Sequence, residues 1–566
     1  MASLIRPTTT PPHTTMRTMF LDRPVRTPRS AVTLIVLASV FMASVGNLSL
    51  WQTLVALPDN TGWRGVAFGV AFGLMIASTL AALMSLLAWR WTLKPVITLL
   101  LLLSAFATHY MLTYGIVVDT PMVINVLQTD TREARDQITW RLGLSVLLLG
   151  VLPSVWVWRQ PWMALSIGQQ LFRTIGLFIA SLLVTLGTTQ LVFQDFASLM
   201  RNHTQLRYQI NPLNSVYALL DLTVIPSDKP SGPLQPLGED ARIAPREGAA
   251  QRPPLLVFVL GETARSSNFS LNGYARLTNP ELAKENVVSF RNVASCGTST
   301  AESVPCMFSH LGREAYAQRK NDFENLLDVL QHAGYAVLWM DNQSGCKDQC
   351  DRIANVNTSN LNLPGQCEGG ECRDTVMLTQ IDAALAKLPA ERRARGTVVV
   401  MHTMGSHGPA YFKRVPTEFK KFLPECTDNS LSQCERSQVV NAYDNTIVFT
   451  DHFLTRVIGW LKGQDKTATT AMLYVSDHGE SLGENNLYLH GLPYSVAPAE
   501  QKQVAMITWL SPSFERLSGI PTACLLKSRD RALSHDHLFH SVLGLMAVQT
   551  EVYQAERDLF KACQAR

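Results

Sequence analysis

Cysteine is absent from the first 295 residues of the chain, although ten cysteines follow in the remainder. Charge is also scarce, since charged residues make up 17% of the chain and the formal net charge is only +4. No basic run, no stripe of interleaved aromatic residues and no internal repeat is present. Nucleic-acid binding needs a concentrated positive surface, so the sequence argues against a nucleic-acid partner.

Long apolar runs dominate the first third of the chain. With 566 residues, of which 47% are hydrophobic, the chain is too long for one domain and too apolar for an ordinary soluble enzyme. Each run is close to the roughly 20 residues that a membrane-crossing helix needs. We therefore predict an α-helical, five-span transmembrane domain over residues 31–194. The predicted spans are Ala31–Trp51, Val66–Trp89, Ile97–Val118, Leu142–Trp158 and Thr174–Phe193.

The cations near these spans predict their orientation, because Lys and Arg at span ends resist translocation. Arg6, Arg17, Arg23, Arg26 and Arg29 precede the first span, Arg90 and Lys94 lie between the second and third, and Arg159 follows the fourth. All lie on one side, so we expect residues 1–30 to be cytoplasmic and everything after Phe193 to be exported. A cleavable signal peptide is the alternative for the first run, but that run is longer than a signal core and more spans follow.

Cysteine usage independently indicates an exported second half. An even number of cysteines confined to that region is typical of disulfides formed in an oxidising compartment. Zinc binding is the competing use of paired cysteines, and the sequence alone does not fix the connectivity. Closeness in sequence favours Cys296–Cys306, Cys346–Cys350, Cys367–Cys372 and Cys426–Cys434, which leaves Cys524–Cys563.

The region after the spans divides into two parts. Residues 195–253 are expected to form helices on the membrane surface, followed by a linker rich in Pro, Gly and charge. Residues 254–566 alternate short apolar runs, at 255–260, 336–340, 397–401 and 471–475, with patterns of helix length. Strands this apolar are covered on both faces, which predicts an α/β domain with a mostly parallel sheet.

Polar side chains follow three of these predicted strands. Glu262 follows the first run, His407 follows the third, and Asp477 and His478 follow the fourth, with His490 further on. Ligands bind beyond the carboxyl ends of such strands, and carboxylates with imidazoles suit a zinc-type cation. A single histidine after a strand is usually structural, so the predicted metal site depends on the coincidence of all five residues. By contrast, His402, His310, His332 and His452 are interpreted as packing residues.

The segment "SCGTSTAESVPC" (residues 295–306) holds four candidate nucleophiles, Thr298, Ser299, Thr300 and Ser303. A helix beginning near residues 298–301 would direct backbone N–H groups toward an anion. Coordination to a metal would make one hydroxyl nucleophilic near neutral pH, while the others would cap the helix. Spacing alone does not identify the attacking hydroxyl.

Five segments in order, "GETARSSNFSLNGYARLTNP", "SCGTSTAESVPCMFS", "DNQSGCKDQC", "GSHGPAY" and "SDHGESLGENNLYLHGLP", resemble the lipid A phosphoethanolamine transferases. This is the EptA family, which includes the mobile colistin-resistance enzymes. With the preceding spans, the resemblance covers most of the chain apart from residues 1–30 and the linker. It implies that the exported domain has an alkaline-phosphatase/sulfatase-like fold.

Carried over position by position, the resemblance implies a role for each matching residue. Thr300 is the implied nucleophile, and Glu262, Thr300, Asp477 and His478 are the implied zinc ligands. His407 and His490 would handle the donor phosphate or a second zinc. Without the resemblance, Asn125, Thr129 and Glu133, spaced four apart, would be interpreted as the solvated face of an interfacial helix. With it, the implied substrate contacts are Asn125, Thr129, Glu133, Ser344 and Lys347.

The implied reaction moves phosphoethanolamine from phosphatidylethanolamine to a lipid A phosphate through a covalent intermediate on Thr300, conferring polymyxin resistance. The implied protein is a monomer in the bacterial inner membrane with a periplasmic catalytic domain. Transfer to core sugars and a phosphoglycerol transferase remain alternatives. A sulfatase lacks support because no Cys-x-Pro-x-Arg-like site occurs, and a receptor with a structural metal is the non-enzymatic alternative. Acceptor, metal identity and metal number stay open at this stage.

Overall fold

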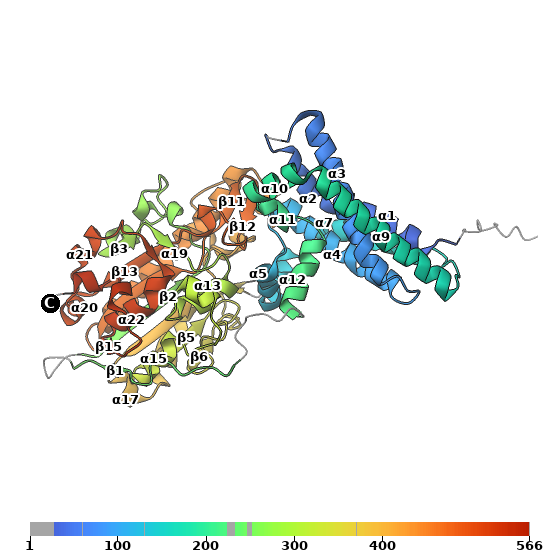
Figure 1. Cartoon of the computed structure of the whole chain (residues 1–566). Coiled ribbons are helices and arrows are strands. Elements are labelled where there is room, and N and C mark those ends of the chain that lie inside the picture. Colours follow the sequence, from blue (N-terminus) through green and yellow to red (C-terminus); the bar gives the residue numbers. More distant parts are fainter. Residues whose placement is uncertain are drawn as a thin grey trace, which may run out of the picture.

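The computed structural model describes residues 28–58, 60–129, 131–223, 232–245, 252–368 and 371–564, without the side chains of residues 131–133. Residues 1–27, which carry four of the arginines used for the orientation, and parts of the linker lie outside the described residues. Figure 1 shows a helical part and an α/β part, with helices α5 (Thr120–Gln128) and α12 (Leu213–Thr223) between them.

Among the residues that the structure describes, five helical spans are long and apolar enough to cross a membrane, which confirms the predicted number. The fifth begins at Ile167 instead of Thr174, because Ser166 and Gln169 form a reciprocal capping box ahead of the apolar run. The third ends at Tyr114 instead of Val118, because Gly115 adopts a left-handed conformation. The spans are α1–η1–α2 (Ala31–Val55), α3 (Gly62–Leu86), α4 (Leu93–Tyr114), α7–η2–α8 (Trp140–Trp158) and α9 (Ile167–Leu191).

A buried asparagine ties the segment after the spans to the helical bundle. This segment contains α10 (Phe193–Asn202), α11 (Gln205–Tyr208) and α12, and Asn211 lies between the last two, fully buried. Its side-chain amide donates to the carbonyls of Gly46 and Ser104 at 3.1 and 2.9 Å, and its backbone N–H donates to Asn47 Oδ1 at 2.8 Å. These bonds join the interfacial segment to the first and third spans.

The α/β domain contains a seven-stranded, mostly parallel sheet in the order β3-β13-β10-β2-β9-β5-β6, which confirms the predicted fold class. Strand β13 runs antiparallel to both of its neighbours. The four predicted strands are β2 (Pro254–Gly261), β5 (Ala336–Asp341), β9 (Thr397–His402) and β10 (Thr469–Ser476). Three further strands were not predicted: β3 (Val287–Phe290), β6 (Ala354–Asn357) and β13 (Met506–Leu510).

Helices cover both faces of this sheet, as the apolar strands require. Alternate residues of β2 enter different clusters: Phe258 packs with residues of α15 (Leu326–His332) and α22 (Leu538–Leu545). Val257 packs with residues of α16 (Val376–Ala386) and α19 (Arg436–Gln464). The sheet is therefore a rigid, doubly covered platform for the loops at its carboxyl edge.

Short elements complete the α/β domain. They are α13 (Thr300–Met307), α14 (Arg313–Ala317), α17 (Ala390–Arg393), α18 (Tyr411–Arg414), α20 (Pro512–Ser518) and α21 (Thr522–Lys527), with the strand pairs β4 (Val293–Ala294) with β14 (Leu533–Ser534), β7 (Cys367–Glu368) with β8 (Glu371–Cys372) and β11 (Ser481–Glu484) with β12 (Leu487–Leu489). The predicted linker also contributes, because β1 (Arg242–Ile243) pairs with β15 (Val548–Gln549). Part of the linker is thus fixed to the domain that follows it.

All ten cysteines form disulfides, and the pairing predicted from closeness is confirmed. The pairs are Cys296–Cys306, Cys346–Cys350, Cys367–Cys372, Cys426–Cys434 and Cys524–Cys563. No cysteine is free, so the zinc-binding alternative for the cysteines is wrong.

The Asn211 network predicts a stability defect. In Asn211→Leu the side-chain bonds to the first and third spans are lost, although the carbonyl of Gly46 keeps its bond from the Thr108 hydroxyl. We expect the change to cost about 1–2 kcal/mol and to lower the Tm of the purified full chain. Asn202→Leu is the control, because this exposed asparagine bonds only to Ser198 of its own helix among the described residues. Equal Tm values for the two variants would contradict the assigned role.

Candidate metal centre and nucleophile

The register of the central strands brings the predicted acidic ligands together. Gly261 of β2 pairs with Ser476 of β10, so the residues that follow, Glu262 and Asp477, emerge side by side at the carboxyl edge. Glu262, Asp477 and His478 are fully buried, and one ligand atom from each lies within 4.8 Å of the others. The structure therefore brings these three predicted ligands into one cluster.

Helix α13 places one hydroxyl against this cluster. Thr300, the first residue of α13, donates from Oγ1 to Glu262 Oε2 at 3.0 Å and lies 3.4 Å from His478 Nε2. The hydroxyls of Thr298 and Ser303 are engaged elsewhere, with the carbonyls of Leu492 and Asp477. Ser299 occupies the N-cap position, but its side chain makes no capping hydrogen bond, so the expected capping role is wrong for this residue. Geometry thus distinguishes Thr300, which spacing did not.

The donor set of the cluster fits a divalent cation. Glu262 Oε1 and Asp477 Oδ2 are buried without a hydrogen-bond partner within the described part of the chain, and face His478 Nε2 at 3.3 and 3.4 Å. His478 Nδ1 lies 2.9 Å from the carbonyl of Gly479, a contact that fixes the ring and leaves Nε2 as a ligand. Two carboxylates, an imidazole and a hydroxyl are a ligand set that zinc accepts.

Electrostatics favour positive charge at this point. Burial lowers the pKa of His478, but attraction to Asp477 and Glu262 outweighs it, so the pKa is raised overall. Burial and the charge of Glu262 raise the pKa of Asp477. Burial also opposes ionisation of Glu262, yet the charge of His478 lowers its pKa. Neighbouring buried carboxylates need a cation, and a divalent metal ion would supply it.

Both remaining predicted histidines lie beside the cluster. The ring of His490 is 4.2 Å from that of His478 and 5.6 Å from that of His407, measured between centroids. His490 Nδ1 is 3.1 Å from Glu480 Oε1. Burial and the charge of His478 lower the pKa of His490. His490 therefore packs against the cluster's His478, and His407 packs against His490.

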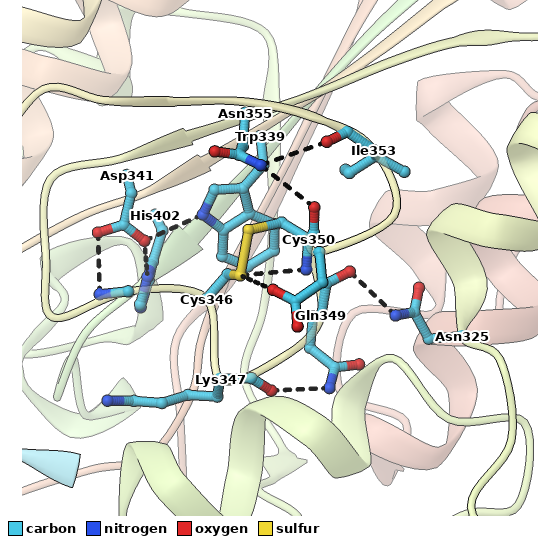
Figure 2. Close-up of a disulfide and its surroundings, with 12 residues drawn as sticks. Asn325, Trp339, Asp341, Cys346, Lys347, Gln349, Cys350, Ile353, Asn355 and His402 are labelled. Carbon is cyan, nitrogen blue, oxygen red and sulfur yellow. Dashed lines mark hydrogen bonds and ion pairs between the residues drawn. A yellow bond between two sulfur atoms is a disulfide. The ribbon is translucent and has the colours of Figure 1, made fainter. Parts of the chain in front are cut away.

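The predicted contacts Ser344 and Lys347 lie on a loop that reaches both the cluster and the membrane part. Lys347 Nζ donates to Ser344 Oγ at 3.0 Å and to the carbonyl of Gln128, at the end of α5, at 3.3 Å. Gln343 connects this loop to the acidic cluster, since its side-chain amide donates to Glu262 Oε2 at 2.9 Å and its Oε1 accepts from Ser344. Figure 2 shows Lys347 extending away from the Cys346–Cys350 disulfide.

The buried His402, interpreted as a packing residue, helps to support this loop. Its Nδ1 lies 3.0 Å from Asp341 Oδ2, and Trp339 donates to the same oxygen (Figure 2). The other oxygen of Asp341 accepts from the backbone N–H groups of Gln343 and Gly345. His402 therefore supports the loop of Ser344 and Lys347 through Asp341.

A largely apolar cavity of about 560 Å³ joins the histidines to the membrane part. Its lining includes His407 and His490 on one side and Asn125 and Thr129 on the other. Thr129 donates from Oγ1 to the carbonyl of Asn125 at 2.7 Å. Glu133 lies within α6 (Thr131–Gln137), but its side chain lies outside what the structure describes. Other lining residues come from α4, including Leu103, Phe106 and Tyr110, and from α12, including Leu219.

Two supporting residues escaped prediction from the sequence. Gln343 directly precedes the predicted contact Ser344, and this position was the available signal for its bond to the predicted ligand Glu262. Glu480 lies in the quoted segment "SDHGESLGENNLYLHGLP", ten positions before His490, and a carboxylate near a histidine was the available signal. The spacing of Glu480 and His490 does not predict their contact, because β11 and β12 must first pair and bring His490 back toward Glu480.

Comparison with protein families matches both parts of the chain. The family described as "Phosphoethanolamine transferase EptA/EptB" matches residues 76–224, and the family described as "Sulfatase" matches residues 254–548. The solved EptA of Neisseria meningitidis, an integral membrane lipooligosaccharide phosphoethanolamine transferase, superposes with a TM-score of 0.90 at 35% identity, over 95% of this chain and 100% of that chain.

Curated relatives extend over nearly the whole chain. Phosphoethanolamine transferase EptA of Escherichia coli K12 is 39% identical over 94% of this chain and 96% of its own length. Phosphatidylethanolamine transferase Mcr-1 of Escherichia coli is 37% identical over 92% of this chain and 96% of its own length. The Kdo(2)-lipid A phosphoethanolamine 7''-transferase of Salmonella typhimurium is 27% identical over 81% of this chain and 82% of its own length. The resemblance drawn from the motifs is thus confirmed, and the chain belongs to the EptA family of phosphoethanolamine transferases, as a multi-pass membrane enzyme.

Proposed function

We propose that this transferase takes phosphoethanolamine from phosphatidylethanolamine and gives it to a lipid A phosphate through a covalent intermediate on Thr300. The cavity of about 560 Å³ carries the proposal, because it links an apolar, membrane-side wall to His407 and His490 beside the buried cluster. A phospholipid has the same two ends, an apolar body and a phosphate head group. The donor would keep its acyl chains near the spans while its phosphate reaches Thr300.

Residues from both parts of the chain would hold the donor head group. Asn125 and Thr129 line the cavity, and Lys347 reaches the carbonyl at the end of α5 while bonding to Ser344. We assign Glu133 to the same group through the family resemblance. The Lys347 ammonium suits the donor phosphate as a point charge.

In the first step Thr300 Oγ1 forms a bond to the donor phosphorus, and the bond from phosphorus to the diacylglycerol oxygen breaks. His407 and His490 are the proton carriers that remove the threonine proton and supply one to the departing oxygen. The hydrogen bond from Thr300 to Glu262 orients the hydroxyl before attack. In the second step an oxygen of the lipid A phosphate attacks the same phosphorus and releases Thr300.

Glu262, Thr300, Asp477 and His478 would hold one zinc ion, which would lower the pKa of the Thr300 hydroxyl and stabilise charge on the phosphoryl oxygens. A second zinc at His407 and His490 is the alternative use of these two histidines. With zinc bound in this way, the side chains of the protein would orient the substrates, transfer protons and exclude water.

The location follows from the substrates and the disulfides. We place the enzyme in the bacterial inner membrane with a cytoplasmic N-terminus and with residues 254–566 as a periplasmic catalytic domain. Its five disulfides suit that oxidising compartment. Adding an amine to lipid A weakens the Coulomb attraction of the surface for cationic peptides, so polymyxin resistance is the expected phenotype. Transfer to a core sugar is the second candidate, because one relative is named for an activity on Kdo(2)-lipid A.

Loss of the nucleophile is the first test. Thr300→Ala in the intact chain, expressed in Gram-negative cells, should reduce phosphoethanolamine on lipid A by on the order of a thousandfold or more, and should abolish polymyxin resistance. Mass spectrometry of lipid A and of core oligosaccharide provides the measurement. The control Ser299→Ala, which removes a neighbouring buried hydroxyl, should retain the modification.

Three outcomes would change the proposal. Phosphoethanolamine found only on the core would replace the acceptor, while modification that persists in Thr300→Ala would exclude Thr300 as the nucleophile. Cells that express the wild-type chain without modification of either molecule would contradict the proposed reaction.

Metal removal is the second test. Purified wild-type chain should carry close to one equivalent of zinc by elemental analysis, lose activity in EDTA and regain it when Zn²⁺ is added. Glu262→Gln should weaken zinc binding by about tenfold or more, because one charged ligand is lost. Glu302→Gln is the control, since this half-buried carboxylate lies in α13 but outside the cluster. Equal zinc content in both variants would contradict the assigned ligand set.

A further inference from the structure

An acidic residue of the membrane part is enclosed by cations of the catalytic part. Asp136 lies in α6, between the third and fourth spans, and is only 5% exposed. Lys413 Nζ contacts its Oδ1, and Arg414 Nη2 lies 3.5 Å from its Oδ2. Asn429 also donates to the backbone carbonyl of Asp136 at 2.8 Å. Two nearby segments of the α/β domain thus bind Asp136: one contains Lys413 and Arg414, and the other contains Asn429.

Arg414 continues the connection from Asp136 to a histidine of the active site. Its Nε donates to the backbone carbonyl of His407 at 3.3 Å, and its Nη1 pairs with Glu371 of β8. The Arg414 side chain is only 4% exposed, so its charge requires carboxylate partners. A guanidinium is planar and rigid, so the contacts of Nη2 with Asp136 and of Nη1 with Glu371 also fix the position of Nε. The position of Asp136 therefore constrains the carbonyl of His407.

The loop that Arg414 holds is closely packed against the second histidine. A Cβ atom added to Gly408 would lie 2.5 Å from Leu489 Cδ2 and 2.8 Å from the Tyr411 hydroxyl oxygen, so the loop fits tightly. Leu489 directly precedes His490, whose ring centroid is 5.6 Å from that of His407. A shift of the 407–414 loop would therefore change the spacing of the two imidazoles.

We infer that Asp136 is a positioning residue: through Arg414 it sets the place of His407, so that docking of the catalytic domain on α6 completes the active site. The inference rests on the proposed function, in which His407 acts on the transferred phosphoethanolamine group. It gives the membrane part a second role besides holding the donor. Asp136 itself touches neither substrate in this account.

A nearby ion pair provides a matched control. Arg141 Nη1, in the fourth span, lies 3.2 Å from Asp428 Oδ2 in the α/β domain, with side chains 29% and 44% exposed. This pair joins the same two parts of the chain but contains no residue of the 407–414 loop. Loss of docking strength alone would affect Arg141→Gln and Asp136→Asn alike, whereas loss of positioning would affect only the second.

The test uses the full-length, zinc-loaded chain in phosphatidylethanolamine vesicles with lipid A as acceptor, at a temperature where every variant is folded. Asp136→Asn should lower kcat by about tenfold to a hundredfold, with a donor KM within about threefold of wild type. Arg414→Lys should behave alike, and the double variant should lose no more than the worse single variant, because both act through one contact. Asp136→Glu should recover part of kcat, and Arg141→Gln should stay within about fivefold.

Wild-type kcat in Asp136→Asn, or an equal loss in Arg141→Gln, would overturn the inference. An effect confined to the donor KM would also overturn it, because Asp136 would then be a binding residue. If Asp136→Asn does not fold, Arg414→Lys decides, and an unchanged kcat refutes the positioning role. A wild-type chain without transferase activity would instead refute the proposed function, and this inference with it.

Discussion

Two carboxylates buried side by side impose the central constraint on this enzyme. Glu262 and Asp477 emerge from paired strands with no solvent exposure, and such a pair is unstable unless positive charge lies between them. In the metal-free protein a protonated His478 supplies that charge, whereas the proposed zinc ion would replace it and take His478 as a neutral ligand. Thr300 and Gln343 bond to Glu262, and His490 packs against His478. The arrangement of these side chains therefore depends on how the negative charge of the two carboxylates is neutralised.

The second constraint is that both proposed substrates are lipids. A sheet that carries the proposed metal site must meet a membrane surface, and the cavity lined by Asn125, Thr129, His407 and His490 joins the two parts of the chain. Contacts between the two parts of the chain are both polar and apolar: Lys347 bonds to the end of α5, and Val117 packs against Leu492 and Ala497. A loose tether would keep the domain near the bilayer, but it would not build a site from both parts.

Much of this organisation was predictable because it depends on local pattern. Five apolar runs predict five spans, closeness predicts five disulfides, and the positions after apolar strands predict that Glu262, Asp477 and His478 lie together. Contacts that depend on distant side chains were not predictable: Asp136 and Arg414 are separated by 278 positions, and Glu480 finds His490 only after a hairpin forms. The start of the fifth span at Ile167 also required the capping box at Ser166, which lies outside the apolar run.

The most direct test of the account is the site of covalent modification. Full-length chain would be mixed with phosphatidylethanolamine in the absence of lipid A, quenched in acid and digested, and peptides from the 295–306 segment would be sequenced by mass spectrometry. The account predicts phosphoethanolamine on Thr300, because its hydroxyl contacts Glu262 and His478. Modification of Thr298, Ser299 or Ser303, or donor cleavage with no adduct on the protein, would contradict it.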